Sequence, residues 1–348
     1  MIRRVDLRGK SLTKSEVNSL IPRAKLDVVA AMAAIEPILE TVRTGKESDL
    51  IALGAKFDGV APQAIRVPKS ELTYALKKLD PEVRESLEIA AVRIRKVHQD
   101  QIRETKISEV EPGATITEKW IPVDRVGLYV PGGRAVYPSS VLMNVIPAQI
   151  AKVPSIAVAS PPQIDNNGWP NATILATCEL LGIEEVYAIG GAQAVALFAY
   201  GMDGVCEKSD MVTGPGNIYV AAAKRALRGV IGIDSEAGPT EIAVLADSSA
   251  IAADVATDLI SQAEHDVIAA SVLVTDSQEL ADQVETELEV RTAKTKHSER
   301  IATALSSQQS AIVIVDNVQQ GLEVVNAYAA EHLEIQTKNA KLDAAQIR

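Results

Sequence analysis

Residues 241–276 read EIAVLADSSAIAADVATDLISQAEHDVIAASVLVTD, and this stretch decides the fold class. Its two ends, EIAVLAD at 241–247 and ASVLVTD at 270–276, are short runs rich in apolar residues. Between them, apolar residues recur at helical spacing. Apolar strands joined by helical sequence indicate a parallel sheet covered by helices on both faces. The stretch therefore predicts a strand, a crossover helix and a second strand.

The same alternation extends over the chain from Val126 onward. Before it, from Thr13 to about Arg103, apolar residues recur at helical spacing, and Asp80-Pro81-Glu82 is typical of a helix start. We therefore predict an α/β protein with parallel sheets that follow a mostly helical region. The further strand candidates are SIAVAS at 155–160, EVYAIGG at 185–191, MVTG at 211–214 and AIVIVDN at 311–317.

Length and composition narrow the class of protein. A chain of 348 residues suits two medium-sized domains, and aromatic residues at only 3% mean that the cores are aliphatic. The formal net charge of −11 opposes binding to nucleic acid, which requires clustered Lys and Arg. No run of about 18 apolar residues occurs, so we expect no membrane span and a cytoplasmic location. Two cysteines are too few for a disulfide framework.

Three glycine-containing turns follow strand candidates and precede helices. They contain or adjoin Tyr129, Gln193 and Asn217, in YVPGGR, GGAQ and TGPGN. Glycines in such places let a backbone approach a phosphate at a helix N-terminus, although a plain tight turn explains them equally well. The turn nearest to a G-x-G-x-x-G motif, GPGNIY, has Tyr219 where the third glycine should be. The glycines alone therefore do not predict a nucleotide site.

Two polar pairs stand near the ends of helical stretches. Gln262 and His265 are three residues apart, a spacing that places both side chains on one helix face and allows a shared ligand. The alternative is an ordinary helix C-cap. Glu331 and His332 are adjacent at the end of GLEVVNAYAAEHL, where they suit two neighbouring proton transfers or simply end the helix.

Seven motifs together resemble the histidinol dehydrogenase family over essentially the whole chain. The resemblance implies an enzyme that oxidises L-histidinol through L-histidinal to L-histidine with two NAD molecules, late in histidine biosynthesis. It also implies a homodimer and two incomplete Rossmann-like domains. These would be 26–128 together with 240–348, and an inserted domain at 129–239, after a helical N-terminal segment at 1–25. The motifs are VGLYVPGG, YPSSVLMNVIPA, IGGAQAVA, GPGN, EAGPTEIAVLAD, SQAEHD and AEHLEI.

The resemblance also implies a role for each candidate residue. His332 matches the base that takes the alcohol proton, and Glu331 matches the group that activates water on the aldehyde. Gln262 and His265 match two ligands of a zinc ion, Zn²⁺, that holds the substrate. Thr240, where relatives often carry serine, matches a substrate contact, as do Gln262, His265 and His332.

For the cofactor, the resemblance implies NAD contacts at Tyr129, Gln193 and Asn217. It further implies that an Asp and a His complete the zinc site from a segment beyond Arg348, because Asp343 is too close to His332 to replace them. Two other interpretations stay open. One is an NAD-dependent aldehyde dehydrogenase that forms a thioester on Cys178 or Cys206, and the other is a binding module without catalysis.

Overall fold

The structure is a computed structural model that describes residues 2–11, 13–23, 28–132, 136–236 and 240–348. The chain divides into two compact units. The first unit consists of Met1–Leu26 and Gly238–Arg348, and the second consists of Asp27–Ala237. The second unit is therefore inserted into the sequence of the first, and we call them the first unit and the inserted unit.

The first unit contains a five-stranded sheet in which all neighbouring strands are parallel. The strand order is β1-β11-β10-β9-β12, so β9 has β10 on one side and β12 on the other. Strand β12 pairs with β9 so that His332 lies opposite Ile242. The strands are β1 (Arg3–Asp6), β9 (Glu241–Ala246), β10 (Ala270–Thr275), β11 (Ala311–Ile314) and β12 (His332–Gln336).

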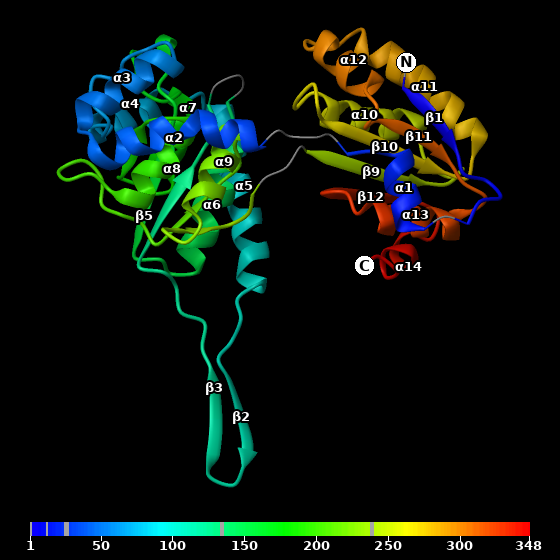
Figure 1. The fold of residues 1–348 in the computed structure, drawn as a ribbon, viewed down its shortest axis with the longest axis horizontal. Helices are drawn as coiled ribbons and strands as arrows, with labels where there is room; N and C mark the ends of the chain where they lie inside the picture. The colour runs from blue at the N-terminus through cyan, green and yellow to red at the C-terminus, as the bar shows by residue number, and fades with distance from the viewer. Residues whose placement is uncertain (1, 12, 24–27, 133–135, 237–239) are drawn as a thin grey trace. The chain divides into compact units, whose positions relative to one another are not determined.

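Helices cover both faces of this sheet (Figure 1). Alternate strand residues separate into two apolar cores, because side chains along a strand point to opposite faces. Val244 and Leu273 pack under α10, α11 and α12, whereas Leu245 and Val274 pack against α1 and α13. The helices are α1 (Lys14–Leu20), α10 (Ala252–Ala263), α11 (Gln278–Thr292), α12 (Ser298–Ser306), α13 (Val318–Tyr328) and α14 (Ala340–Ala344).

The inserted unit contains a second parallel sheet, with strand order β6-β5-β4-β7-β8. Strand β4 lies at its centre, and every residue of β4 is buried. From β4 the chain adds β5 and β6 on one side and then returns to add β7 and β8 on the other. The strands are β4 (Arg125–Tyr129), β5 (Ser155–Ser160), β6 (Val186–Ala188), β7 (Met211–Thr213) and β8 (Gly232–Ile233).

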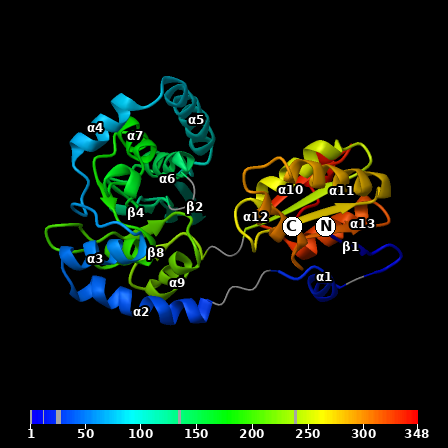
Figure 2. The same cartoon turned by 90° about the horizontal axis from the view of Figure 1, so that it is seen from above.

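Two layers of helices enclose the second sheet (Figure 2). Helices α2, α3, α8 and α9 pack on one face, and α4, α6 and α7 pack on the other. Helix α5 lies against α6 through Leu87, and the Asp80 side chain caps its first turn as the sequence predicts. The elements are α2 (Val28–Thr44), α3 (Glu47–Phe57), α4 (Lys69–Lys78), α5 (Pro81–Asp100), α6 (Pro138–Ile150), a 3₁₀ turn (Ile164–Asn166), α7 (Ala172–Leu180), α8 (Gly191–Tyr200) and α9 (Ile218–Leu227).

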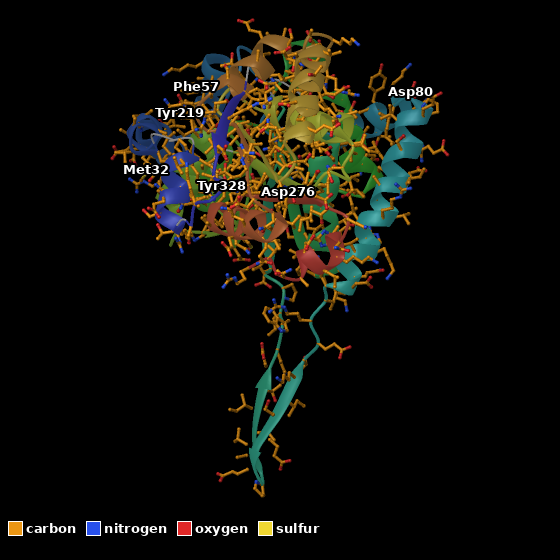
Figure 3. The ribbon with its side chains drawn as sticks, turned by 90° about the vertical axis from the view of Figure 1, so that its right-hand side faces the viewer. Met32, Phe57, Asp80, Tyr219, Asp276 and Tyr328 are labelled. Atoms are coloured by element: carbon orange, nitrogen blue, oxygen red, sulfur yellow. The ribbon has the colours of Figure 1, made fainter. Side chains whose placement is uncertain are left out.

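A two-stranded antiparallel hairpin extends from the inserted unit (Figure 1). It consists of β2 (Lys106–Glu111) and β3 (Ala114–Glu118), and nearly every residue in it is exposed. Its side chains stand clear of the helices of that unit (Figure 3). Ile107 and Ile116 are more than half exposed, so the hairpin contributes no core of its own.

The predicted α/β class and the parallel sheets are confirmed, and all six strand candidates form strands. The predicted grouping of residues 26–128 with 240–348 differs from the structure. Helices α2 to α5 belong to the inserted unit because their apolar faces are buried against its sheet and helices, as at Ile35 and Leu72. The segment 1–25 is not a separate helical piece, since it supplies strand β1 as well as α1 to the first unit.

None of the described helices combines the length and the apolar character that a bilayer crossing requires. Both cysteines are buried free thiols.

Candidate functional site

Several predicted site residues meet at the amino edge of the first sheet. Thr240 directly precedes β9, and His332 is the first residue of β12, opposite Ile242. Helix α10 follows β9 and leads back to the amino end of β10, so its last turn, which contains Gln262, lies at this same edge. Parallel pairing thus gathers residues that are up to 92 positions apart in the sequence, because all amino ends of a parallel sheet share one edge.

A side-chain hydrogen bond joins two of these residues. The Gln262 amide Nε2 donates to the Thr240 hydroxyl, and Gln262 is only 6% exposed. This bond directs Nε2 toward Thr240 and leaves the amide oxygen as the group that can face a ligand. Helix α10 ends at Ala263, so His265 lies in the turn just after it, and its backbone N–H donates to the Gln262 carbonyl at 3.2 Å. The His265 side chain is exposed.

The structure corrects the helical prediction for Glu331 and His332. Helix α13 ends at Tyr328, and Ala329 adopts a left-handed conformation with φ of 51°. Glu331 therefore lies in a bend, and His332 opens strand β12 instead of ending a helix. His332 Nε2 lies 3.9 Å from Glu331 Oε2, and both side chains are more than half exposed. An acid and an imidazole thus stand side by side at an open edge.

Arg23, which no sequence motif marks, holds the turn that leads into Glu331. Its guanidinium donates to the carbonyl oxygens of Tyr328 and Ala329, the latter at 2.6 Å, and lies 3.0 Å from Glu241 Oε2. Burial raises the pKa of Glu241, Arg23 lowers it, and the charge of Glu331 raises it. Arg23 therefore ties the turn before β12 to the start of β9. No local sequence signal shows these contacts, because all three partners are more than 200 residues away.

The donor set at this edge suits part of a zinc site. Within the described ranges, no three His, Cys, Asp or Glu side chains are grouped so as to hold a metal. Gln262 and His265 offer an amide oxygen and an imidazole. Imidazole is a usual zinc ligand and glutamine an uncommon one, and tetrahedral zinc needs four donors. These two side chains therefore fit half of such a site.

The other three predicted residues follow strands at the carboxyl edge of the second sheet. Tyr129 ends β4, Gln193 lies in the first turn of α8 after β6, and Asn217 caps α9 after β7. The winding of this sheet reverses between β4 and β7. Ligands of open α/β sheets bind at such a reversal, beyond the carboxyl ends of the strands. Tyr129 and Asn217 lie on the two sides of it.

Tyr129 connects two of the turns. Its hydroxyl accepts a hydrogen bond from the Gly191 N–H at 3.1 Å, and burial raises the pKa of this hydroxyl to about 12. Gln193 is also buried, at 4% exposed, and its amide oxygen lies over Gly191. The phenol therefore acts as a neutral hydrogen-bonding group that fixes the turn before α8.

Asn217 is exposed and uses its side-chain oxygen as a helix cap. This oxygen accepts from the backbone N–H groups of Tyr219 and Val220 at 3.0 and 3.2 Å. The side-chain amide nitrogen is then the group that can reach a ligand. Gly133, Arg134 and residues 237–239, which belong to two of the predicted motifs, lie outside the described residues.

Asp58 is a polar group at this edge that sequence reasoning missed. It is the C-cap residue that follows α3, and its Oδ2 is buried without a hydrogen-bond partner among the described residues. Burial raises the pKa of its carboxyl to about 6. Its charge acts on Tyr129, and its Oδ1 lies against Gly190. In the sequence, Asp58 is one polar residue at a helix end, with no sign of this environment.

Two cavities among the described residues of the inserted unit lie away from Tyr129, Gln193 and Asn217. They have volumes of about 1280 and 760 Å³, and the first surrounds the amino ends of β4, β5 and β6. As described, neither is lined by Tyr129, Gln193 or Asn217.

Comparison with known proteins identifies the family of this chain. The sequence model of the histidinol dehydrogenase family matches residues 21–348. A histidinol dehydrogenase from Thermobifida fusca is 60% identical over 348 residues, which are 100% of this chain and 78% of that protein. The chain belongs to the histidinol dehydrogenase family. It is therefore an oxidoreductase of histidine biosynthesis.

Further relatives within the histidinol dehydrogenase family support this. The protein from Corynebacterium glutamicum is 54% identical over 348 residues, which are 100% of this chain and 79% of that protein. A crystal structure of histidinol dehydrogenase from Elizabethkingia anophelis matches with a TM-score of 0.90 and 31% identity, covering 100% of this chain and 78% of that one.

The pH dependence of stability provides a test of the Asp58 environment. The Asp58 carboxyl binds its proton more tightly in the folded protein than in the unfolded chain, where the pKa of aspartate is about 4. The folded state therefore loses stability as the pH rises from about 4 to about 6. We expect Asp58→Asn to remove this loss. Because the group is partly exposed, we expect a gain of about 1–2 kcal/mol above pH 6 and none below pH 4.

Thermal unfolding of the wild type and Asp58→Asn at a series of pH values measures this difference. Asp203→Asn, at an exposed position of the same unit, is the matched control. A constant difference between wild type and Asp58→Asn from pH 4 to 8 would show that the Asp58 carboxyl does not titrate in this range.

The cysteines provide a second test. Burial raises the pKa of the Cys178 thiol to about 12, and burial also raises the pKa of Cys206. Thiolates are the reactive form, so neither group suits a thioester mechanism. We expect the double variant Cys178→Ala, Cys206→Ala to keep its dehydrogenase rate within about twofold, as measured by NADH absorbance; loss of the rate without unfolding would contradict this.

Proposed function

We propose that this chain oxidises L-histidinol through L-histidinal to L-histidine and reduces two NAD molecules, late in histidine biosynthesis. The proposal rests on membership of the histidinol dehydrogenase family. The observation that carries it is the gathering of Thr240, Gln262 and the pair Glu331–His332 at one sheet edge. A hydroxyl, an amide, a carboxylate and an imidazole there match a substrate with an alcohol, an amine and an imidazole.

The exposed imidazole of His332 is the base of the first oxidation. It accepts the hydroxyl proton of the alcohol while a hydride leaves the carbon for NAD, which gives the aldehyde, NADH and a proton. A base placed in this way contributes about 10² to 10⁴ in rate. The strand position of His332 holds its backbone in the sheet while the side chain faces solvent.

Glu331 serves the second oxidation. Its carboxylate accepts a proton from water, and the water oxygen adds to the aldehyde carbon. A second hydride then leaves the hydrated aldehyde for a second NAD, and the product is a carboxylate. Because Glu331 and His332 are 3.9 Å apart, the two groups are close enough to serve the same carbon in turn.

Zinc and NAD are assigned to different edges. Zinc, when bound through the Gln262 oxygen and the His265 imidazole with further donors, acts as a Lewis acid that holds the substrate nitrogens. Thr240, Gln262, His265 and His332 are the proposed substrate contacts. Tyr129, Gln193 and Asn217 are the proposed NAD contacts, and the winding reversal between β4 and β7 supports this. We further propose a cytoplasmic homodimer.

Substitution of the catalytic pair tests the mechanism. We expect His332→Asn to lower NADH production from L-histidinol by about 10² to 10⁴, because the base is lost. We expect Glu331→Gln to lower the oxidation of added L-histidinal by a similar factor, with a smaller effect on the first oxidation. His98→Asn, at an exposed histidine of the inserted unit, is the control. Equal rates in wild type and His332→Asn would disprove the role of His332.

Zinc binding gives a separate readout. We expect His265→Ala to weaken zinc binding at least about 10-fold, because loss of even an outer partner of a metal ligand costs 10- to 100-fold. Titration with a zinc-binding dye, with His98→Ala as control, measures the affinity directly. Unchanged zinc affinity in His265→Ala would place the metal elsewhere.

A further inference from the structure

The inserted unit contains a buried lysine that no step above uses. Lys224 lies on α9 and is only 1% exposed. Its Nζ donates to Asp234 Oδ1 at 2.6 Å and to the carbonyl oxygen of Gly214 at 2.5 Å. Lysine is almost never fully buried unless it is paired, because removal of its charge from water is unfavourable. Apolar packing alone therefore does not explain why Lys224 is buried beside Asp234.

Asp234 completes the hold on the same glycine. Its Oδ2 accepts the backbone N–H of Gly214 at 2.9 Å. The ion pair thus binds both polar backbone groups of one residue, the carbonyl through Lys224 and the N–H through Asp234. Three elements meet here, since Gly214 follows β7, Lys224 is on α9 and Asp234 follows β8.

Gly214 is in turn pressed against the end of β4. Its φ of 119° is reached without strain only by glycine, and a Cβ at this position would lie 2.0 Å from the carbonyl oxygen of Tyr129. Gly214 also begins the turn that ends at Asn217. The position of Gly214 therefore sets how Asn217 and Tyr129 stand relative to each other across the winding reversal.

A neighbouring ion pair shows the contrast. Arg225, the next residue of α9, pairs with Glu236, but the Arg225 side chain is 45% exposed, and among the described residues neither partner has a hydrogen bond to the Gly214 turn. An exposed pair of this kind contributes little to stability. The two pairs share one helix and one following segment. They differ in the burial of the cation and in the backbone groups that Lys224 and Asp234 bind.

We propose that Lys224 and Asp234 are positioning residues for NAD. They hold the Gly214–Asn217 turn in the position in which Asn217 and Tyr129 both contact the cofactor. The inference rests on the proposed function, because NAD at this edge is part of that proposal. Lys224 itself is buried and acts through Gly214. The pair is buried at Lys224, whereas the Asp234 side chain is 32% exposed. Removal of one partner of a buried pair lowers stability, so a selective effect on NAD binding in a folded variant distinguishes positioning from a purely structural role.

The test compares Lys224→Met and Asp234→Asn with Arg225→Met as the matched control. We expect the KM for NAD to rise about 10- to 100-fold in Lys224→Met, since displacement of about 1 Å at a site costs up to about 100-fold. Asp234→Asn should give a smaller rise. At saturating NAD, kcat and the KM for L-histidinol should stay within about twofold in both, and Arg225→Met should match the wild type throughout.

Direct titration with NAD, monitored by calorimetry, separates the possible failures. If folded Lys224→Met and Asp234→Asn bind NAD as tightly as the wild type does, the inference is overturned and the proposed function is not. A parallel fall in kcat and in the affinity for both substrates would indicate a purely structural role and also overturn it. If Lys224→Met does not fold, Asp234→Asn decides. Absence of NAD binding by the wild type overturns the proposed function together with this inference.

Discussion

Parallel pairing of β4 with β7, and of β9 with β12, is the constraint on which the candidate site depends. At each of these pairs the winding of the sheet reverses, so the connections on either side leave in opposite directions. Tyr129 and the Gly214 turn flank the first pair, and Thr240 and His332 flank the second. Arg23, the Asn217 cap and the ion pair Lys224–Asp234 all fix the chain segments beside these two reversals.

The candidate residues lie at the amino edge of the first sheet and at the carboxyl edge of the second sheet. Helix electrostatics differ between these two edges. Helices α8 and α9 begin at the carboxyl edge of the inserted unit, where their positive ends favour an anion such as a pyrophosphate. Helix α10 ends at the amino edge of the first unit, where its negative end favours a cation. The helix ends therefore favour the proposed dinucleotide at the first edge and the proposed metal, with a cationic amine, at the second.

Runs that are apolar on both faces were predictable, because a buried parallel strand such as 241–246 has no polar side. Strand β12 was not, since HLEIQ alternates polar and apolar residues at a sheet edge and follows a helix directly. The apolar faces of α2 to α5 show that they are buried, but not against which sheet. The roles of His332 and Gln262 came from family motifs, while Arg23, Asp58 and Lys224 have partners that no local pattern indicates.

The pairing of β1 with β11 also shapes how the molecule is made. The Gly9 N–H donates to Asp316 across 307 residues, next to the register that aligns Arg3 with Ala311. At about 5–20 residues per second, the first strand waits on the order of tens of seconds on the ribosome for its partner. The inserted unit, which is continuous in sequence, is complete well before then. Arg3 and Arg4 keep the waiting strand charged, which discourages edge-to-edge association with other nascent chains.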